Sequence, residues 1–154
     1  MNDDFLDLLS ALLDADARFL IVGAYAVGVH ARPRATKDLD VWVEASPENS
    51  RRVIRALKAF GAPIDNLDDD DFARPVTGFM MGAPPNRIDI LTEISGVTFG
   101  EAWPNQVVAG VGRNLQCPFI GMTDLIRNKR AAARQQDLVD VTILERIAGR
   151  SKRT

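Results

Sequence analysis

Two aspartates separated by one residue, Asp38 and Asp40, stand in a stretch that alternates charged and apolar side chains. This alternation predicts a half-buried strand. Successive side chains of a strand point to opposite faces, so the two aspartates share one face, and Leu39, Val41 and Val43 share the other, which we expect to be the core. Neighbouring carboxylates repel each other unless a proton or a cation lies between them. An all-oxygen site of this kind suits Mg²⁺.

A third carboxylate, Asp89, lies inside a second predicted strand, residues 87–91. Asp is unfavourable inside strands, so its presence needs an explanation. Ile88 and Ile90 share the face opposite Asp89 and predict that this face is buried. An exposed sheet edge would tolerate a lone aspartate, but together with Asp38 and Asp40 we expect Asp89 to complete one metal site.

A phosphate-binding element is predicted just before this strand. Residues 18–22 form a short apolar run typical of a buried strand, Gly23 ends it, and residues 24–31 are predicted to be helical. The start of a helix has unpaired N–H groups and the positive end of the helix dipole, both of which favour phosphate. A tight turn would also favour glycine here, so both interpretations stay open.

The connection to the aspartate strand is basic, with Arg32, Arg34 and Lys37 around Thr36. These cations either neutralise the aspartates in a solvated loop or meet a triphosphate beside a metal. His30, the single histidine, is either a packing residue at the end of its helix or a group of the acceptor site.

Periodicity and end signals predict the remaining elements. Ser46 and Pro47 suit the start of a helix, and Gly61 its end. The acidic run 68–71 is interpreted as solvated. The predicted ranges are helices at 3–16, 47–60, 98–103, 123–134 and 136–148, a strand at 76–81, a hairpin of 106–109 and 114–117 around residues 110–112, and a frayed tail from about 150 to 154.

The two C-terminal helices carry further candidates. Helical spacing puts Lys129 at the inward edge of its helix, either as a surface lysine with its stem on the core or as a phosphate-binding cation. Asp137 and Asp140 either orient Lys129 or Arg134 through ion pairs or act as favourable charges at a helix start. Four apolar residues are expected to face inward: Leu138, Val141, Leu144 and Ile147.

Composition limits the function classes. The chain has 154 residues, the size of one domain, 46% hydrophobic residues and a net charge of −2, which excludes a general electrostatic affinity for nucleic acid. One cysteine and one histidine exclude an internal disulfide and an ordinary structural zinc site. The acidic N-terminus and the lack of a long apolar run predict a cytoplasmic protein without a membrane anchor.

These residues resemble a known family. Gly23-Ala24, then thirteen residues, then Asp38-Leu39-Asp40, with a later Asp89, resembles the signature of the polymerase-β-like nucleotidyltransferases. The sequences of residues 22–43 and 118–140 are similar to those of small bacterial nucleotidyltransferases of abortive-infection and toxin–antitoxin systems. The resemblance implies an α/β (α+β) nucleotidyltransferase fold, a mixed β-sheet flanked by helices with two C-terminal helices, as a single domain over residues 1–154.

The resemblance also implies an activity. Two Mg²⁺ ions, for which Mn²⁺ can substitute, would be held by the catalytic residues Asp38, Asp40 and Asp89, and an NMP would move from an NTP to an acceptor hydroxyl with release of pyrophosphate. The acceptor would be an RNA end such as that of a tRNA, a partner protein or a small molecule. The implied nucleotide-binding residues are Gly23, Ala24, Arg34, Thr36, Lys37 and Lys129.

Two alternatives accompany this expectation. Ala24 stands where the family has Gly or Ser, so a hydroxyl is missing unless Thr36 replaces it. A catalytically weak protein of the same fold, acting as an antitoxin or regulatory partner, fits that departure. A metal-dependent phosphohydrolase is the other alternative. The three aspartates favour an active enzyme, because like charges kept together repel at a cost in stability.

Overall fold

The computed structural model describes residues 1–32 and 38–152. Along the chain it contains α1 (Asp3–Asp14), β1 (Phe19–Val22), α2 (Gly23–His30), β2 (Asp38–Val43), α3 (Pro47–Phe60), η1 (Asp71–Ala73), β3 (Gly78–Met81), β4 (Arg87–Leu91), α4 (Phe99–Ala102), η2 (Trp103–Asn105), β5 (Val107–Gly112), β6 (Leu115–Phe119), α5 (Met122–Ala132) and α6 (Gln135–Lys152).

The strands form one open mixed sheet in the order β3-β4-β2-β1-β6-β5. Strand β2 pairs with β1 antiparallel and with β4 parallel, and β1 pairs with β6 parallel. Strands β3 and β5 are the two edges, each antiparallel to its neighbour. The predicted α+β class with a mixed sheet and two C-terminal helices is therefore confirmed.

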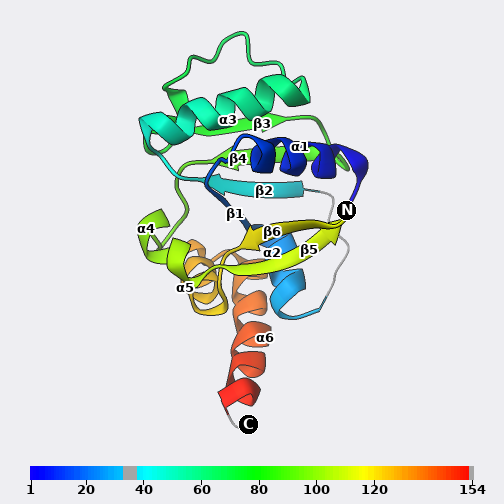
Figure 1. The fold of residues 1–154 in the computed structure, drawn as a ribbon. Helices are drawn as coiled ribbons and strands as arrows, with labels where there is room; N and C mark the ends of the chain where they lie inside the picture. The colour runs from blue at the N-terminus through cyan, green and yellow to red at the C-terminus, as the bar shows by residue number, and fades with distance from the viewer. Residues whose placement is uncertain (33–37, 153–154) are drawn as a thin grey trace.

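The helices lie on both sides of this sheet. Figure 1 shows α1 and α3 together over one side, while α2, α5 and α6 cluster on the other. The end of α6 projects away from the sheet in the same view. The sheet is therefore a middle layer, and strands β1 and β2 lie at its centre.

Several helix ends form as the sequence predicts. Ser46 accepts a hydrogen bond from the backbone N–H of Asn49, Pro47 begins α3, and Gly61 ends it in the left-handed region with φ of 90°. Asn2 caps α1 by accepting from the N–H of Phe5 at 2.9 Å. These caps satisfy backbone donors and acceptors that a helix leaves without partners at its ends.

The core extends to both faces of β2. Leu39, Val41 and Val43 are fully buried, as predicted. Trp42 lies on the aspartate face and is nevertheless only 1% exposed, because Phe99 of α4 packs edge-on against its ring at 5.1 Å between centroids. The aspartate face is thus closed at the Trp42 end of the strand and half-open at the Asp38 end.

The predicted hairpin is present as β5 and β6, but its turn lies at other residues than predicted. The chain reverses at Arg113 and Asn114, both at positive φ (50° and 60°), which matches a two-residue turn between right-twisted strands. The expected turn at residues 110–112 instead belongs to β5, where the ladder has an irregularity between Gly110 and Gly112. The glycines mark a distortion within the strand rather than its end.

Two predicted boundaries and one predicted burial are corrected. Strand β3 begins at Gly78 because Val76 has a positive φ of 59° and is 80% exposed. Helix α6 continues to Lys152, beyond the predicted end at residue 148. Leu138 is 49% exposed rather than inward, because the buried side of α6 holds Asp137, Asp140, Val141 and Leu144.

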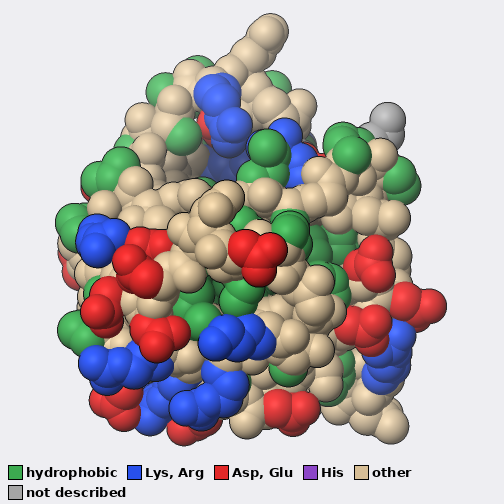
Figure 2. Space-filling view, turned by 90° about the horizontal axis from the view of Figure 1, so that it is seen from above, with side chains coloured by type: hydrophobic (Ala, Val, Ile, Leu, Met, Phe, Trp, Pro, Cys, Tyr) green, Lys and Arg blue, Asp and Glu red, His purple; other side chains and the backbone are tan. Residues whose placement is uncertain are grey.

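The charged surface is mixed in sign. Figure 2 shows acidic and basic side chains side by side over the top of the molecule, where α3 and the connection after it lie. The run 68–71 is polar and largely exposed, as predicted. In the part of the chain that the structure describes, no helix combines the length and apolar character needed to cross a membrane.

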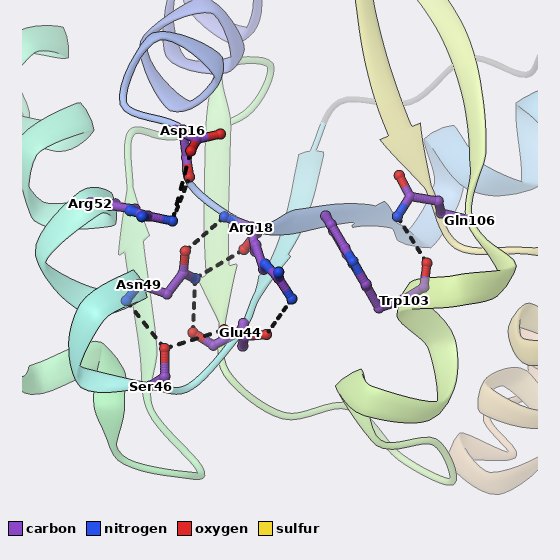
Figure 3. Close-up of polar contacts among 8 residues, drawn as sticks. All are labelled: Asp16, Arg18, Glu44, Ser46, Asn49, Arg52, Trp103 and Gln106. Carbon is purple, nitrogen blue, oxygen red and sulfur yellow. Dashed lines mark hydrogen bonds and ion pairs between the residues drawn. The ribbon is translucent and has the colours of Figure 1, made fainter.

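One buried amide joins the two central strands to α3. Asn49 is 2% exposed, accepts from the Arg18 N–H at 2.7 Å, and donates to the carbonyls of Arg18 (3.0 Å) and Glu44 (2.9 Å). Figure 3 shows this amide lying between the backbone before β1 and the backbone after β2. It therefore sets the positions of the two strands on which the aspartate face depends.

We expect Asn49→Ala to lower the free energy of unfolding by roughly 2–4 kcal/mol. The Arg18 N–H and the Glu44 carbonyl lose their hydrogen bonds to the amide, and the Arg18 carbonyl keeps its bond from the Glu44 N–H but loses the amide. Asn49→Asp should be similarly harmful, since its carboxylate faces two carbonyls. Urea denaturation measures both, with the exposed Asn66→Ala as control. If Asn49→Ala has the same free energy of unfolding as Asn66→Ala, the Asn49 amide does not hold the two strands in place.

Candidate functional site

Three carboxylates meet on one face of two adjacent strands. Asp40 of β2 lies directly beside Asp89 of β4 in the parallel register, and Asp38 lies beside Arg87. Adjacent strands are about 4.8 Å apart, so side chains at paired positions are within reach of each other. The structure thus brings together the three aspartates that the sequence singled out. Among the described residues, no three acidic, His or Cys side chains form a group that could hold a metal ion as they stand.

Gly23 makes room for the Asp40 carboxylate. A Cβ atom added to Gly23 would lie 2.3 Å from Oδ2 of Asp40, and the glycine has a positive φ of 70°. Any other residue would therefore collide with the carboxylate and strain the backbone. Strand β1 ends beside Asp40, because Val22 pairs with it in the antiparallel register. The glycine that begins α2 and the carboxylate are thus one packed unit.

The surroundings of Asp40 disfavour its charge. Burial is the largest cause, followed by repulsion from and a hydrogen bond with Asp89 and repulsion from Asp38, and together they raise the pKa of Asp40 to about 7. The positive charge of Lys129 acts in the opposite direction. Near neutral pH Asp40 is therefore partly protonated, and its proton lies in the hydrogen bond with Asp89.

Arg87 is a site residue that the sequence interpretation did not identify. Its Nε lies 3.2 Å from Oδ2 of Asp89, and its Nη2 donates to Oδ1 at 3.3 Å. The signal was present, because Arg87 lies two residues before Asp89 and hence on the same face of β4. Its backbone position is also paired with Asp38 in the register of β2 and β4.

The proposed phosphate-binding residues are only partly placed. Gly23 and Ala24 are the first two residues of α2 and are both half-buried, beside the carboxylates. Arg34, Thr36 and Lys37 fall within residues 33–37, outside the described residues. The structure therefore joins the helix start to the acidic face and leaves the basic connection as a prediction.

Lys129 lies in a buried ion-pair cluster. Its Nζ is 3.1 Å from Oδ1 of Asp137 and 3.0 Å from Oδ2 of Asp140, and all three side chains are at least 94% buried. Burial raises the pKa of Asp137, but hydrogen bonds from Arg134 and Lys129 outweigh it and bring the pKa below its ordinary value. The ion pairs of the first interpretation are present, and Asp137 also lies in the first turn of α6, as the second interpretation expects. The cluster joins α5 to α6.

His30 supports the packing interpretation. Its Nε2 donates to the carbonyl of Ile120 at 2.7 Å, and this bond links the end of α2 to the residue after β6. The acceptor is a carbonyl oxygen, so Nε2 must carry a proton. The histidine thus anchors the helix whose first residue contacts Asp40.

Comparison of the chain with models of known protein families and with curated proteins gives no match.

We expect Asp40→Asn to stabilise the protein at pH 8 by roughly 2–4 kcal/mol. The pKa of Asp40 is higher in the folded state than in the unfolded state. The parent protein therefore has its full free energy of unfolding below the unfolded-state pKa near 3.8, and this free energy falls as the pH rises through about 7, where folded Asp40 ionises. The advantage of the variant should therefore shrink towards pH 4. Urea denaturation at pH 8, 6 and 4.5 with EDTA measures it, and the exposed Asp69→Asn is the control. A stability difference that does not change with pH would show that the ionisation of Asp40 is not its source.

We expect Lys129→Met to lower the free energy of unfolding by roughly 3–5 kcal/mol, because the buried Asp137 and Asp140 both lose their ion pair with Lys129. Arg130→Met is the matched control on the same helix: Arg130 pairs with Glu145 at the surface, and its loss should change stability by less than about 1 kcal/mol. Adding Asp137→Asn and Asp140→Asn to Lys129→Met should recover part of the loss. Equal melting temperatures for the two single variants would contradict the cluster's role.

Proposed function

We propose that this protein is a magnesium-dependent nucleotidyltransferase, which moves an NMP from an NTP to an acceptor hydroxyl and releases pyrophosphate. One observation carries the proposal: Asp38, Asp40 and Asp89 share one face of two parallel strands, and the glycine that begins α2 packs against Asp40. Carboxylates beside a helix start combine a place for a divalent cation with a place for phosphate.

The donor set suits Mg²⁺ in its chemistry. Asp40 and Asp89 are adjacent oxygen donors whose repulsion is relieved by a shared proton, and a divalent cation would replace that proton. Asp38 would be the third ligand. Asp89 would have to exchange its contact with Arg87 for the cation, since no metal-binding group of three stands ready among the described side chains. When bound, Mg²⁺ would neutralise charge on the phosphates and lower the pKa of the attacking hydroxyl.

The protein residues would then supply orientation and charge. The backbone N–H groups at the start of α2 would hold phosphate oxygens, which suits Ala24 because backbone donors need no side-chain hydroxyl. Asp89 would face the acceptor hydroxyl and accept its proton as the acceptor oxygen attacks the α-phosphorus. Negative charge grows on the leaving pyrophosphate, so cations beside it contribute most to catalysis.

The cations near the carboxylates differ in what they can do. Lys129 is near enough to lower the pKa of Asp40, but its ammonium is held by Asp137 and Asp140. We assign it an electrostatic and structural part rather than direct phosphate contact. Arg134 interacts electrostatically with Asp40 and is 79% exposed, so it and Arg87 are better placed to reach a triphosphate. Lys37, Arg34 and Thr36 remain proposed nucleotide-binding residues.

We expect ATP or another NTP with Mg²⁺ to raise the melting temperature. Transfer is measured by incubating each labelled NTP with a cell lysate and following the label into RNA, protein and small molecules. Asp38→Asn and Asp40→Asn should each reduce transfer at least 100-fold, since each removes a metal ligand, about 2.7 kcal/mol of transition-state stabilisation. The exposed Asp69→Asn should transfer like the parent, and Mn²⁺ should support activity in place of Mg²⁺.

The outcomes separate the candidate functions. Transfer that survives both aspartate substitutions would refute the metal assignment. Stabilisation by NTP without transfer to any acceptor would support a binding protein, such as an antitoxin or regulatory partner in a toxin–antitoxin pair. Release of inorganic phosphate without transfer would indicate a phosphohydrolase.

A further inference from the structure

Arg87 holds the carboxylate of Asp89 by both of its oxygens. The Nε of Arg87 lies 3.2 Å from Oδ2 and 3.4 Å from Oδ1 of Asp89, and its Nη2 lies 3.3 Å from Oδ1. Charge-assisted hydrogen bonds between such groups are strongest at about 2.7–2.9 Å. The contact therefore restrains Asp89 without binding it tightly, and a ligand of higher charge can take the place of the guanidinium.

The oxygens that Arg87 contacts are the ones that a divalent cation needs. A hydrogen bond joins Asp89 to Asp40, so the Asp89 carboxylate lies between a second carboxylate and a guanidinium. A cation that binds Asp40 and Asp89 together would come next to the positive charge of Arg87, and like charges at short range disfavour each other. A divalent cation and the guanidinium therefore compete for Asp89.

Arg87 lies at the end of the aspartate face through which a triphosphate could approach. Trp42, packed under Phe99, closes the other end of this face. Arg87 is paired in register with Asp38, at the half-open end, and its side chain is 39% exposed. A guanidinium forms two parallel hydrogen bonds to a phosphate group as readily as to a carboxylate. A triphosphate that enters at this end therefore offers Arg87 a second partner.

The backbone at Arg87 is held on both sides. After it, Ile88 and Ile90 are at most 2% exposed and anchor β4 in the core. Before it, the Asn2 side chain donates to Oδ1 of Asn86 at 2.9 Å and ties the preceding turn to the start of α1. A change of partner at Arg87 is therefore a rotation of one long side chain, which is fast and leaves the strand in place.

We propose that Arg87 passes from Asp89 to the triphosphate, and that this exchange makes nucleotide and divalent cation favour each other's binding. Both ligands are those of the proposed nucleotidyl transfer, on which this exchange rests. Without nucleotide, Arg87 competes with the cation for Asp89. With nucleotide, the guanidinium pairs with phosphate oxygens, and both oxygens of Asp89 become available. The coupling is reciprocal, because each ligand displaces the same ion pair.

Metal affinity without nucleotide tests the first half of the exchange. Mn²⁺ is the probe, and electron paramagnetic resonance measures the free ion in solutions of the full chain. We expect Arg87→Gln to bind Mn²⁺ on the order of tenfold more tightly than the parent, a coupling of ordinary size. Arg87→Lys should lie between the two, because it keeps the charge and loses the bidentate contact. Arg74→Gln removes an equal charge from a pair with Asp71 and should bind like the parent.

Phosphate affinity without metal tests the second half. Tripolyphosphate in EDTA is the probe, because it carries the linked phosphates of any NTP without a base. Titration calorimetry should show that Arg87→Gln binds it about fivefold more weakly than the parent, while Arg74→Gln binds it equally well. Melting curves in EDTA show whether each variant is folded, and a loss of stability with both affinities unchanged would mean that Arg87 is only a structural ion-pair partner.

Opposite changes of the two affinities in Arg87→Gln support the exchange. Unchanged Mn²⁺ affinity in Arg87→Gln, or unchanged tripolyphosphate affinity, would overturn it. So would an equal gain of Mn²⁺ affinity in Arg134→Gln, which would show a general effect of charge near Asp40. Asp40→Asn measures Mn²⁺ bound elsewhere on the protein. If the parent and Arg87→Gln both bind no more Mn²⁺ than Asp40→Asn, the proposed metal site fails; if they bind more but equally, only the exchange fails.

Discussion

The burial of the Asp40 carboxylate beside Asp89 is the constraint on which the site depends. Two carboxylates lie side by side in the parallel register of β2 and β4, and the first is packed against Gly23. Burial and like charge hold the pKa of Asp40 at about 7, so the ionised pair destabilises the fold at neutral pH. A divalent cation would remove that instability, which is why the same arrangement suits both a proton and a metal.

The rest of the fold holds this unfavourable pair in place. The Asn49 amide ties the start of β1 to the end of β2, and His30 ties the end of α2 to the residue after β6. Lys129 joins α5 to α6 through two buried carboxylates. Each junction is a directional polar contact, with the side chain buried at Asn49 and Lys129 and half-buried at His30, and it tolerates little displacement. The carboxylates are thus kept near one another by directional bonds as well as by the apolar core.

Local signals predicted the secondary structure closely where periodicity and caps agree. Alternation identified β2 and β4, and Ser46, Pro47 and Gly61 gave both ends of α3. Prediction failed where a local signal has two meanings. The glycines near residue 111 suggested a turn but lie in an irregular strand, and Leu138 looked inward although charged residues occupy the buried side of α6. An apolar side chain is buried only if a neighbouring element covers it, and that neighbour is not encoded in helical spacing.

The sequence by itself determined which functional groups are available to the site: three aspartates in strands, a glycine before a helix, and cationic side chains near them in the chain. Residue types and the two-residue period of a strand are sufficient for that. Only the tertiary structure decided that β4 lies beside β2 in the register that pairs Asp40 with Asp89, that Arg87 holds Asp89, and that Lys129 is buried between two carboxylates. These depend on contacts between segments far apart in the chain, whose alignment is set by packing and which no local pattern specifies.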